Sequence, residues 1–385
     1  MDRRVYLASR VRPLTPREIS MGSKSCIVVD DNCTTLVNPE TGDAKAFVLD
    51  YSYDSTDASR SEESADNHRI FKDVGTKIVS DALQGFNTCF FAHGQPQTGK
   101  TYTLIGQESD PGFLPRLLES LFQQEEVVGG RVAVFASFYE LAQENVRDVL
   151  RRDFYTPGGL KVRMRSDGSG SDIDGLTKSR LKTMADCEEF LAQVLRCMGG
   201  LAQSSHTFFT IELFNPQDIT RAGSEKPRPI SKVHLVDLAG STAGGGDSFI
   251  GGKPRPTPQD KSLLAWANVM SALAESQMLQ GRARGGPKGG KIFVPFRGSV
   301  LTRILEDSMG PRSRSYVIAN LSPSHLAYKE TLNTFRLIVR TKEVKKVVRN
   351  DQILNAYLGD TEFIPAAGGG WRWAYCTKQP EGDAA

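Results

Sequence analysis

The chain has 385 residues, of which 39% are hydrophobic and 24% are charged, and its formal net charge is +3. These proportions are ordinary for a soluble globular protein, and the small net charge excludes a strong overall field for an acidic partner. We therefore expect no nucleic-acid partner. No apolar run is long enough to span a membrane, no signal peptide opens the chain, and the six cysteines show neither a C-x-x-C pair nor a metal-binding spacing. A soluble cytoplasmic protein with no membrane contact is expected.

Predicted strands and helices alternate along the chain. Strands are expected where β-branched and aromatic residues form short apolar runs, at 5–11, 87–92, 131–141, 206–214, 230–237 and 316–321. Helices are expected where apolar residues recur every three or four positions, at 70–83, 114–122, 187–198, 260–279, 300–310 and 328–348. This alternation predicts an α/β fold with helices on both faces of a central sheet.

The segments between these elements are rich in turn residues. Residues 14–45 are expected to form short strands and turns, and 52–67 a polar surface loop. Residues 240–258 are dense in glycine and proline. Because proline cannot occupy the interior of a helix, Pro254, Pro256 and Pro258 require the next helix to begin near Asp260.

A glycine-rich loop follows the predicted strand 87–92 and fits the pattern G-x-x-x-x-G-K-[ST]. Its residues are Gly94, Gln95, Pro96, Gln97, Thr98, Gly99, Lys100 and Thr101. Such a loop surrounds phosphates with backbone N–H groups, and its lysine and hydroxyl serve the outer phosphates and Mg²⁺. The alternative is a strand-to-helix turn without a ligand. Proline has no N–H, so Pro96 predicts weaker phosphate binding.

Several further segments resemble the signatures of kinesin motor domains and occur in that family's order. They are 10–13 (RVRP), 91–95 (FAHGQ), 137–141 (SFYEL), 146–150 (VRDVL), 205–206 (SH), 236–241 (VDLAGS), 261–263 (KSL), 294–297 (VPFR), 301–303 (LTR) and 330–336 (ETLNTFR). Residues 50–54 and the basic loop before Val294 are most similar to the kinesin-3 class. The N-K-x-D motif with which GTPases read their base is absent from the sequence. An unrelated phosphate-loop kinase or GTPase would require these collinear motifs to be coincidental.

The resemblance implies a phosphate-loop NTPase fold with a central mixed, mostly parallel sheet over residues 1–347. Residues 348–385 would form a neck-linker-like segment and an unstructured tail. The cofactors implied are ATP and Mg²⁺, and the partner implied is the microtubule, which places the protein on the cytoskeleton in the cytoplasm.

The resemblance also implies roles around the nucleotide. Arg10, Pro13 and His93 would border the adenine, although His93 reads equally well as a half-buried histidine without a ligand. Lys100 would pair with the β- and γ-phosphates and Thr101 would ligate Mg²⁺. The remaining two positions are Asp237, which would hold Mg²⁺ through water, and Gly240, whose N–H would sense the γ-phosphate.

The two switch motifs depart from the family pattern. The first switch of the family reads N-x-x-S-S-R-S-H, and residues 199–206 read G-G-L-A-Q-S-S-H. Ser205 and His206 match its end, and Ser204 supplies the Mg²⁺-binding serine only if one residue is deleted. The arginine is missing, and Thr242 replaces its glutamate partner in the second switch. The chain is therefore either a motor that closes by other contacts or a nucleotide- and microtubule-binding module with little or no hydrolysis.

Basic residues gather where kinesin-3 motors carry a lysine-rich loop that faces acidic tubulin tails. They are Arg282, Arg284, Lys288 and Lys291, followed by Arg297. The resemblance implies that these residues bind microtubules. A solvated basic surface is the alternative interpretation.

Overall fold

The computed structural model describes residues 5–56, 66–151, 158–165, 170–201, 205–221, 227–240, 249–250, 253–254, 258–282, 293–309, 313–341, 361–366 and 370–375. Several residues singled out from the sequence lie outside these ranges, namely Ser204, Thr242, Arg284, Lys288 and Lys291. At Arg282 only the backbone is described.

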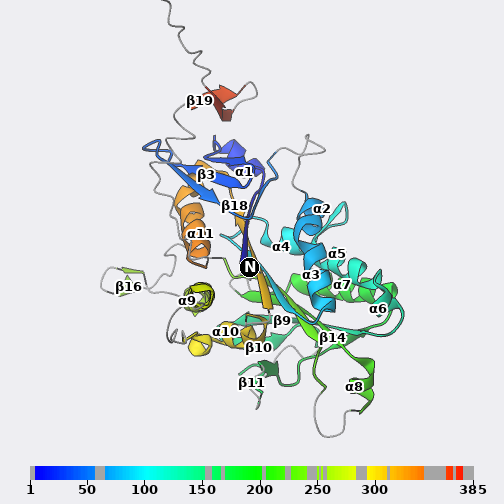
Figure 1. Cartoon of the computed structure of the whole chain (residues 1–385). Coiled ribbons are helices and arrows are strands. Elements are labelled where there is room, and N and C mark those ends of the chain that lie inside the picture. Colours follow the sequence, from blue (N-terminus) through cyan, green and yellow to red (C-terminus); the bar gives the residue numbers. More distant parts are fainter. Residues whose placement is uncertain are drawn as a thin grey trace, which may run out of the picture.

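A nine-stranded mixed sheet forms the centre of the fold (Figure 1). Its order is β10 (Asn145–Asp148), β9 (Ala133–Ala142), β14 (His206–Phe214), β15 (Ser231–Asp237), β6 (Asn87–His93), β18 (Ser313–Leu321), β1 (Val5–Val11) and β5 (Tyr51–Asp54), with β13 (Ser179–Leu181) paired to β9. The run from β15 to β5 is parallel, whereas β14 joins it antiparallel. The predicted α/β architecture is confirmed.

Helices cover both faces of this sheet. They are α1 (Pro16–Ser20), α2 (Asn67–Ile70), α3 (Thr76–Leu83), α4 (Lys100–Leu104), α5 (Phe113–Phe122), α6 (Glu125–Val128), α7 (Met184–Met198), α8 (Pro216–Arg221), α9 (Pro258–Arg282), α10 (Val300–Ile304) and α11 (Tyr328–Thr341). A π-helical turn, η1 (Phe71–Gly75), joins α2 to α3, and short 3₁₀ turns are η3 (Phe296–Gly298), η4 (Glu306–Ser308) and η5 (His325–Ala327). No helix in the described part of the chain is long and apolar enough to cross a bilayer.

Smaller sheets lie at the margins of the central one. A three-stranded sheet contains β2 (Ile27–Asp30), β3 (Cys33–Val37) and β4 (Ala44–Val48). The two-stranded pairs are β7 (Gly106–Gln107) with β8 (Asp110–Pro111), β11 (Val162–Met164) with β12 (Ser171–Ile173), β16 (Phe249–Ile250) with β17 (Lys253–Pro254), and β19 (Thr361–Ala366) with β20 (Gly370–Tyr375).

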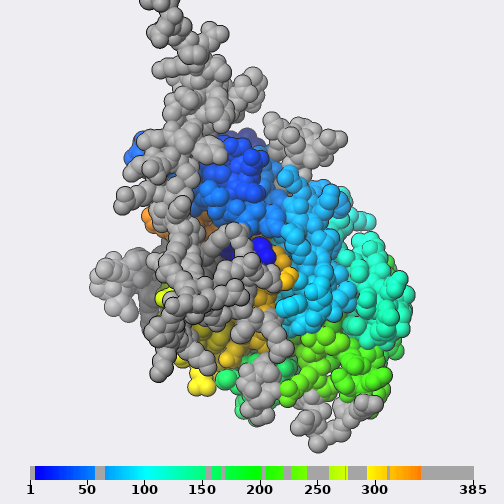
Figure 2. Space-filling view, viewed as in Figure 1, coloured from blue at the N-terminus to red at the C-terminus, as the bar shows by residue number. Residues whose placement is uncertain are grey.

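Alternate residues of each strand enter two separate cores. On one face Phe90 and Phe209 pack with α3, α5 and α7. On the other face Phe91 and Tyr139 pack with α9, α10 and α11. Figure 1 shows these two groups of helices on opposite sides of the sheet, and Figure 2 shows the segment from α2 to α6 covering the right flank. The period of two along a strand explains this division.

The positions of helices α9 and α1 depart from the sequence prediction. Helix α9 begins at Pro258, two residues before Asp260, because proline is tolerated in the first turn, where its missing N–H has no partner in any case. Helix α1 lies where only strands and turns were predicted. Thr15 and Glu18 form its capping box and Pro16 occupies its first turn, a signature that the sequence does contain.

The side chain of Trp266 occupies the centre of the core under α9. It is fully buried, and its ring centroid lies 5.2 Å from that of Phe91 and 6.4 Å from that of His93. We expect Trp266→Ala to lower the free energy of unfolding by about 3–5 kcal/mol, because it removes buried contacts and leaves a cavity. Urea denaturation would measure the change.

Leu264 on the same helix provides the control because it is 48% exposed. Leu264→Ala is expected to change the free energy of unfolding by no more than about 0.5 kcal/mol. Equal losses in the two variants would contradict the position assigned to Trp266.

Candidate phosphate-binding site

The glycine-rich loop leaves the sheet at the end of β6, which lies between two parallel strands. Ala92 is paired with Asp237 of β15, and His93 is paired with Ala319 of β18. The carboxyl ends of the three strands therefore meet at one edge. In open α/β sheets, ligands bind outside this edge.

Two glycines shape the loop for steric reasons. Gly94 has a φ of +154°, and a Cβ there would lie 2.2 Å from the carbonyl oxygen of Asn320. Gly99 has a φ of +91° and caps the N-terminus of α4. A side chain is excluded at the first position by contact and disfavoured at the second by conformation.

A cation, a hydroxyl and a carboxylate converge beside this loop. Nζ of Lys100 donates to the carbonyl oxygens of Gly94 and Gln95 at 3.2 and 2.9 Å. Oγ1 of Thr101 donates to Oδ2 of Asp237 at 2.6 Å. Burial lowers the pKa of Lys100 and raises the pKa of Asp237, and their mutual attraction opposes both shifts. Hard oxygen donors such as these fit Mg²⁺, and the lysine fits phosphate.

Pro96 brings the loop into contact with the segment after β15. A Cβ at Gly240 would lie 2.9 Å from Cδ and 3.0 Å from Cγ of Pro96. Pro96 therefore offers no N–H to a phosphate, but its ring fills the space next to Gly240. Any side chain at Gly240 would displace the loop.

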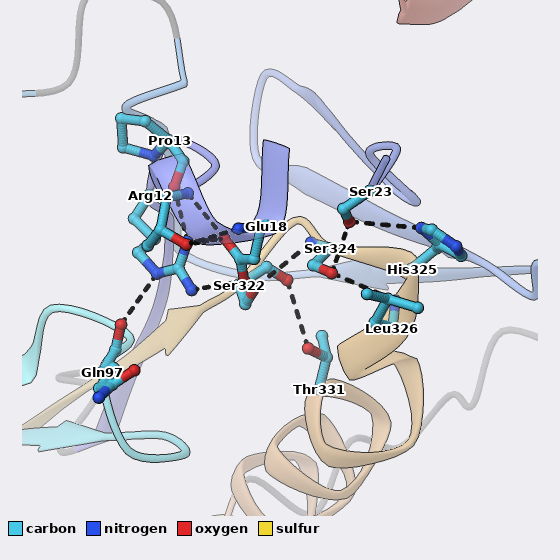
Figure 3. Close-up of polar contacts among 11 residues, drawn as sticks. Arg12, Pro13, Glu18, Ser23, Gln97, Ser322, Ser324, His325, Leu326 and Thr331 are labelled. Atoms are coloured by element: carbon cyan, nitrogen blue, oxygen red, sulfur yellow. Dashed lines mark hydrogen bonds and ion pairs between the residues drawn. The ribbon is translucent and has the colours of Figure 1, made fainter. Parts of the chain in front are cut away.

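Gln97 has a left-handed backbone, with a φ of +63°, although it is not glycine. Nε of Arg12 donates to its carbonyl oxygen at 2.9 Å (Figure 3). The two terminal nitrogens of Arg12 bind both carboxylate oxygens of Glu18 at 2.7 and 2.8 Å. The hydrogen bond from Arg12 is the main reason that the pKa of Glu18 falls to about 2. Sequence reasoning missed Arg12, even though it is part of the R-V-R-P motif that was singled out.

The same carboxylate connects the loop to α11. Oε1 of Glu18 accepts from Oγ of Ser322 at 2.8 Å, and the carbonyl oxygen of Ser322 accepts from Oγ1 of Thr331 at 3.4 Å (Figure 3). A cavity of about 400 Å³ opens beside this network and is lined in part by Arg12 and Pro96. Arg12 thus holds the loop, and Arg12 is in turn held by Glu18, which Ser322 contacts from the end of β18.

The structure contradicts the surroundings expected for His93. Its ring has no exposed surface, and burial lowers its pKa to about 3. A nucleotide could contact this ring only if the core opened. Of the two alternatives given for His93, the histidine without a ligand is the one that fits, although the ring is fully buried rather than half-buried, because the helix that covers it and carries Trp266 is remote in sequence.

Arg10 is also buried, and only 5% of it is exposed. One of its terminal nitrogens donates to Asn67 at 2.6 Å and to Thr103 at 2.9 Å, and its guanidinium lies 5.1 Å from the ring centroid of Tyr102. Arg10 therefore supports α4 from within. Pro13 is exposed.

Tyr102 is a residue that sequence reasoning missed. It is half-buried, follows Lys100 and Thr101 directly, and its hydroxyl donates to Asp110 at 2.8 Å. An aromatic residue in the first turn after the loop was the available signal. Its ring is fixed by Arg10 on one side and by Asp110 at its tip.

His206 joins three segments near the loop. Its Nδ1 accepts from the backbone N–H of Ala239 at 3.0 Å, so Nε2 carries the proton and donates to Oγ of Ser262 at 2.7 Å. Burial lowers the pKa of His206 to about 3 and keeps the ring neutral. His206 thereby connects three parts of the chain: the start of β14, the segment that contains Gly240, and helix α9. Ser205 is buried next to it.

Of the predicted basic residues, Arg297 has a described side chain. It is exposed in η3, and its Nη2 lies 4.0 Å from Sδ of Met164.

Comparisons with known proteins identify the family. Residues 10–344 match the Kinesin motor domain family model. The chain is 35% identical over 363 residues to Kinesin-like protein KIF16B of Homo sapiens and 33% identical over 363 residues to Kinesin-like protein KIF1C of Homo sapiens. These alignments cover 88% and 89% of this chain but only 27% and 31% of the relatives. Both relatives are kinesin-3 proteins.

Solved structures agree with this result. A KIF14 fragment with ADP in complex with a microtubule has a TM-score of 0.72 and 26% identity, with coverage of 89% of this chain and 96% of that fragment. A KIF14 dimer with AMP-PNP in complex with a microtubule also has a TM-score of 0.72. The sequence match, the shared fold and the phosphate loop at the end of β6 together show that this chain belongs to the kinesin motor domain family.

Proposed function

We propose that this chain is a microtubule-binding motor domain that uses ATP and Mg²⁺. The observation that carries the proposal is the convergence of Lys100, Thr101 and Asp237 beside a phosphate loop in a kinesin motor domain. The solved relatives that support it hold ADP or AMP-PNP and are in complex with a microtubule. Such a protein acts on the microtubules of the cytoskeleton in the cytoplasm.

The residues of the loop divide the work of holding the nucleotide. Lys100, which now bonds to two loop carbonyls, exchanges them for the outer phosphate oxygens. Thr101 would ligate Mg²⁺ and Asp237 would hold it through water, and Ser204 is a further candidate ligand from the first switch. When bound, Mg²⁺ neutralises charge on the outer phosphates. The backbone N–H of Gly240 senses the γ-phosphate.

The base lies between Pro13 and Tyr102 in this proposal. Pro13 is exposed, and the ring of Tyr102 is held in place by Arg10 and Asp110. A fixed aromatic ring offers a stacking surface that the buried His93 lacks. This assignment replaces the one made from the sequence for His93, and it gives Arg10 a supporting role.

Slow hydrolysis is the second part of the proposal. The arginine that closes the switches in the family is missing from residues 199–206, and Thr242 replaces its glutamate partner, so no charged latch encloses the γ-phosphate. The joint loss leaves neutral residues and avoids an unpaired charge. His206 still joins the first switch to Ala239 and α9, a contact that does not depend on the latch.

A module that holds nucleotide and microtubule without hydrolysis is the other candidate, and the missing latch favours it. Steady-state ATPase measurements with and without microtubules separate the two candidates. A microtubule-stimulated rate supports the motor domain. A rate at background under both conditions supports the non-hydrolysing module.

Nucleotide binding is expected to depend on Lys100. Lys100→Ala removes the charge that faces the outer phosphates, so affinity for MgATP should fall roughly 10- to 100-fold, the range expected for one charged hydrogen-bonding group. Isothermal titration calorimetry would measure it. Lys182→Ala is the control, because Lys182 is exposed before α7. Equal affinities in the two variants would refute the phosphate site.

Arg12 is expected to act through Gln97. Arg12→Ala should weaken MgADP binding in the natural background, because the left-handed Gln97 loses its carbonyl partner. In a Gln97→Gly background the loss should be smaller, because glycine adopts this conformation without support. Coupled residues in contact differ from additivity by about 0.5–3 kcal/mol. Calorimetry on the four proteins would detect this coupling, and additive losses would mean that Arg12 acts on the nucleotide independently of Gln97.

Microtubule binding is expected to depend on the basic loop. Neutralising Arg282, Arg284, Lys288 and Lys291 together should lower affinity and flatten its salt dependence, because exposed charges are screened beyond about 8 Å at physiological ionic strength. Co-sedimentation over a salt series would measure both effects. A variant that neutralises four basic residues on other surfaces is the control: Lys72, Arg131, Lys182 and Arg196. If both variants pellet like the natural chain, the basic loop has no part in binding.

A further inference from the structure

A second cavity, of about 440 Å³, lies on the sheet face that packs against α9 and α10. Lys232 and His234 line it from the first half of β15, whereas Asp237 ends that strand beside the phosphate loop. Asp237 lies five positions beyond Lys232 and three beyond His234, or roughly 16 and 10 Å along the strand. The cavity is therefore distinct from the nucleotide site. The β11–β12 hairpin, at the bottom of Figure 1, contributes another wall.

Apolar side chains form much of the lining. Phe135 and Tyr139 of β9 and Phe214 of β14 supply aromatic rings, and Leu176 and Ile304 supply aliphatic surface. A cavity of this size falls within the range of about 300–1,000 Å³ that is typical of small-molecule sites. Flat rings on strands offer stacking surfaces to an aromatic guest.

Charged groups at the cavity are already paired. Three ion pairs are present: Arg165–Asp172 at 2.6 Å, Lys178–Glu212 at 2.5 Å and Lys232–Asp307 at 2.7 Å. Each contains one cation and one anion, so the formal charges of the three pairs cancel. A guest with a net charge would find no unpaired counterion among these groups, and burying it would be unfavourable. The lining therefore selects an uncharged molecule.

Two polar atoms at the cavity lack a partner within the described part of the chain. They are Nε2 of His234, whose residue is 3% exposed, and Oγ of Ser171, whose residue is 5% exposed. Oγ1 of Thr210 donates to the hydroxyl of Tyr139 at 3.4 Å, so Nδ1 of His234 donates to Thr210 at 2.8 Å. Nε2 is then an acceptor, and burial keeps the ring neutral by lowering its pKa to about 4.

We propose that this cavity binds a small, uncharged aromatic molecule that donates one hydrogen bond to Nε2 of His234. An N–H or O–H group on the guest satisfies the one acceptor that the protein leaves open on this ring. Ser171 supplies a hydroxyl that can meet a second polar atom. The aromatic side chains of β9 and β14 hold the ring of the guest.

Indole and 1-methylindole are matched probes for this site, since they differ in the hydrogen-bond donor. Calorimetry on the full chain should show indole binding with a sub-millimolar Kd and 1-methylindole binding roughly fivefold to tenfold more weakly, which is the effect of one hydrogen bond. His234→Phe, which keeps a ring and removes the acceptor, should reduce the affinity for indole to that for 1-methylindole. Saturating MgADP should leave the affinity for indole unchanged, because the two sites are separate.

Leu176→Trp supplies a second variant at a half-buried position on the cavity wall. Its larger side chain should fill the cavity and abolish indole binding while thermal denaturation shows a folded protein. Three outcomes would overturn the proposal: no binding of either probe at millimolar concentration, equal affinity for the two probes, or binding that persists in Leu176→Trp. The first of these means that the cavity holds water only. None depends on ATP hydrolysis, so the proposed function is tested separately.

Discussion

The close approach of Gly94 to the carbonyl oxygen of Asn320 fixes the point at which the phosphate loop leaves the sheet. With 2.2 Å available where a Cβ would stand, only glycine permits β6 and β18 to remain paired up to the start of the loop. The parallel register then places Asp237 at the same edge. The contact between Thr101 and Asp237 follows from this backbone arrangement. Side chains complete the site, but the register of three strands positions it.

Much of the fold could be predicted because it depends on local patterns. The strands were found as apolar runs, the helices by their spacing, and the loop by its glycines and lysine. Pro254, Pro256 and Pro258 located the start of α9 to within two residues, since a proline restricts its own backbone wherever it lies. Collinear motifs then extended the interpretation to the family.

The roles of individual side chains could not be predicted in the same way. Whether His93 faces a ligand or the core depends on Trp266, which arrives from a distant helix. Arg10 was expected beside the base, and it lies under Tyr102, where Asn67 of α2 and Thr103 of α4 satisfy its guanidinium. Burial is a property of the assembled layers. A sequence motif specifies which residue is present, but not whether the folded chain buries that residue.

The chain stabilises an unusual loop with unusual partners. A non-glycine residue in the left-handed region costs on the order of 1–3 kcal/mol, and a hydrogen bond to a charged donor contributes about 1.5–3 kcal/mol. The bond from Arg12 to Gln97 is therefore large enough to offset the strain. The bidentate pairing of Arg12 with Glu18 holds the donor in place and extends the support to Ser322 and α11. The phosphate loop and α11 consequently share one polar network.

Three neutral imidazoles in the interior make this domain acid-labile. The pKa values of His93 and His206 are about 3 and that of His234 is about 4, against 6.5 for a solvated histidine. Between pH 6.5 and these lower pKa values, the unfolded chain binds protons that the folded chain does not bind. The free energy of unfolding therefore falls as the pH drops below about 6.5 and continues to fall toward pH 4. Up to three protons are taken up on unfolding in that window, which makes the dependence steep. The sensitivity lies in the hydrophobic interior, where changes to the surface charge of the domain would not remove it.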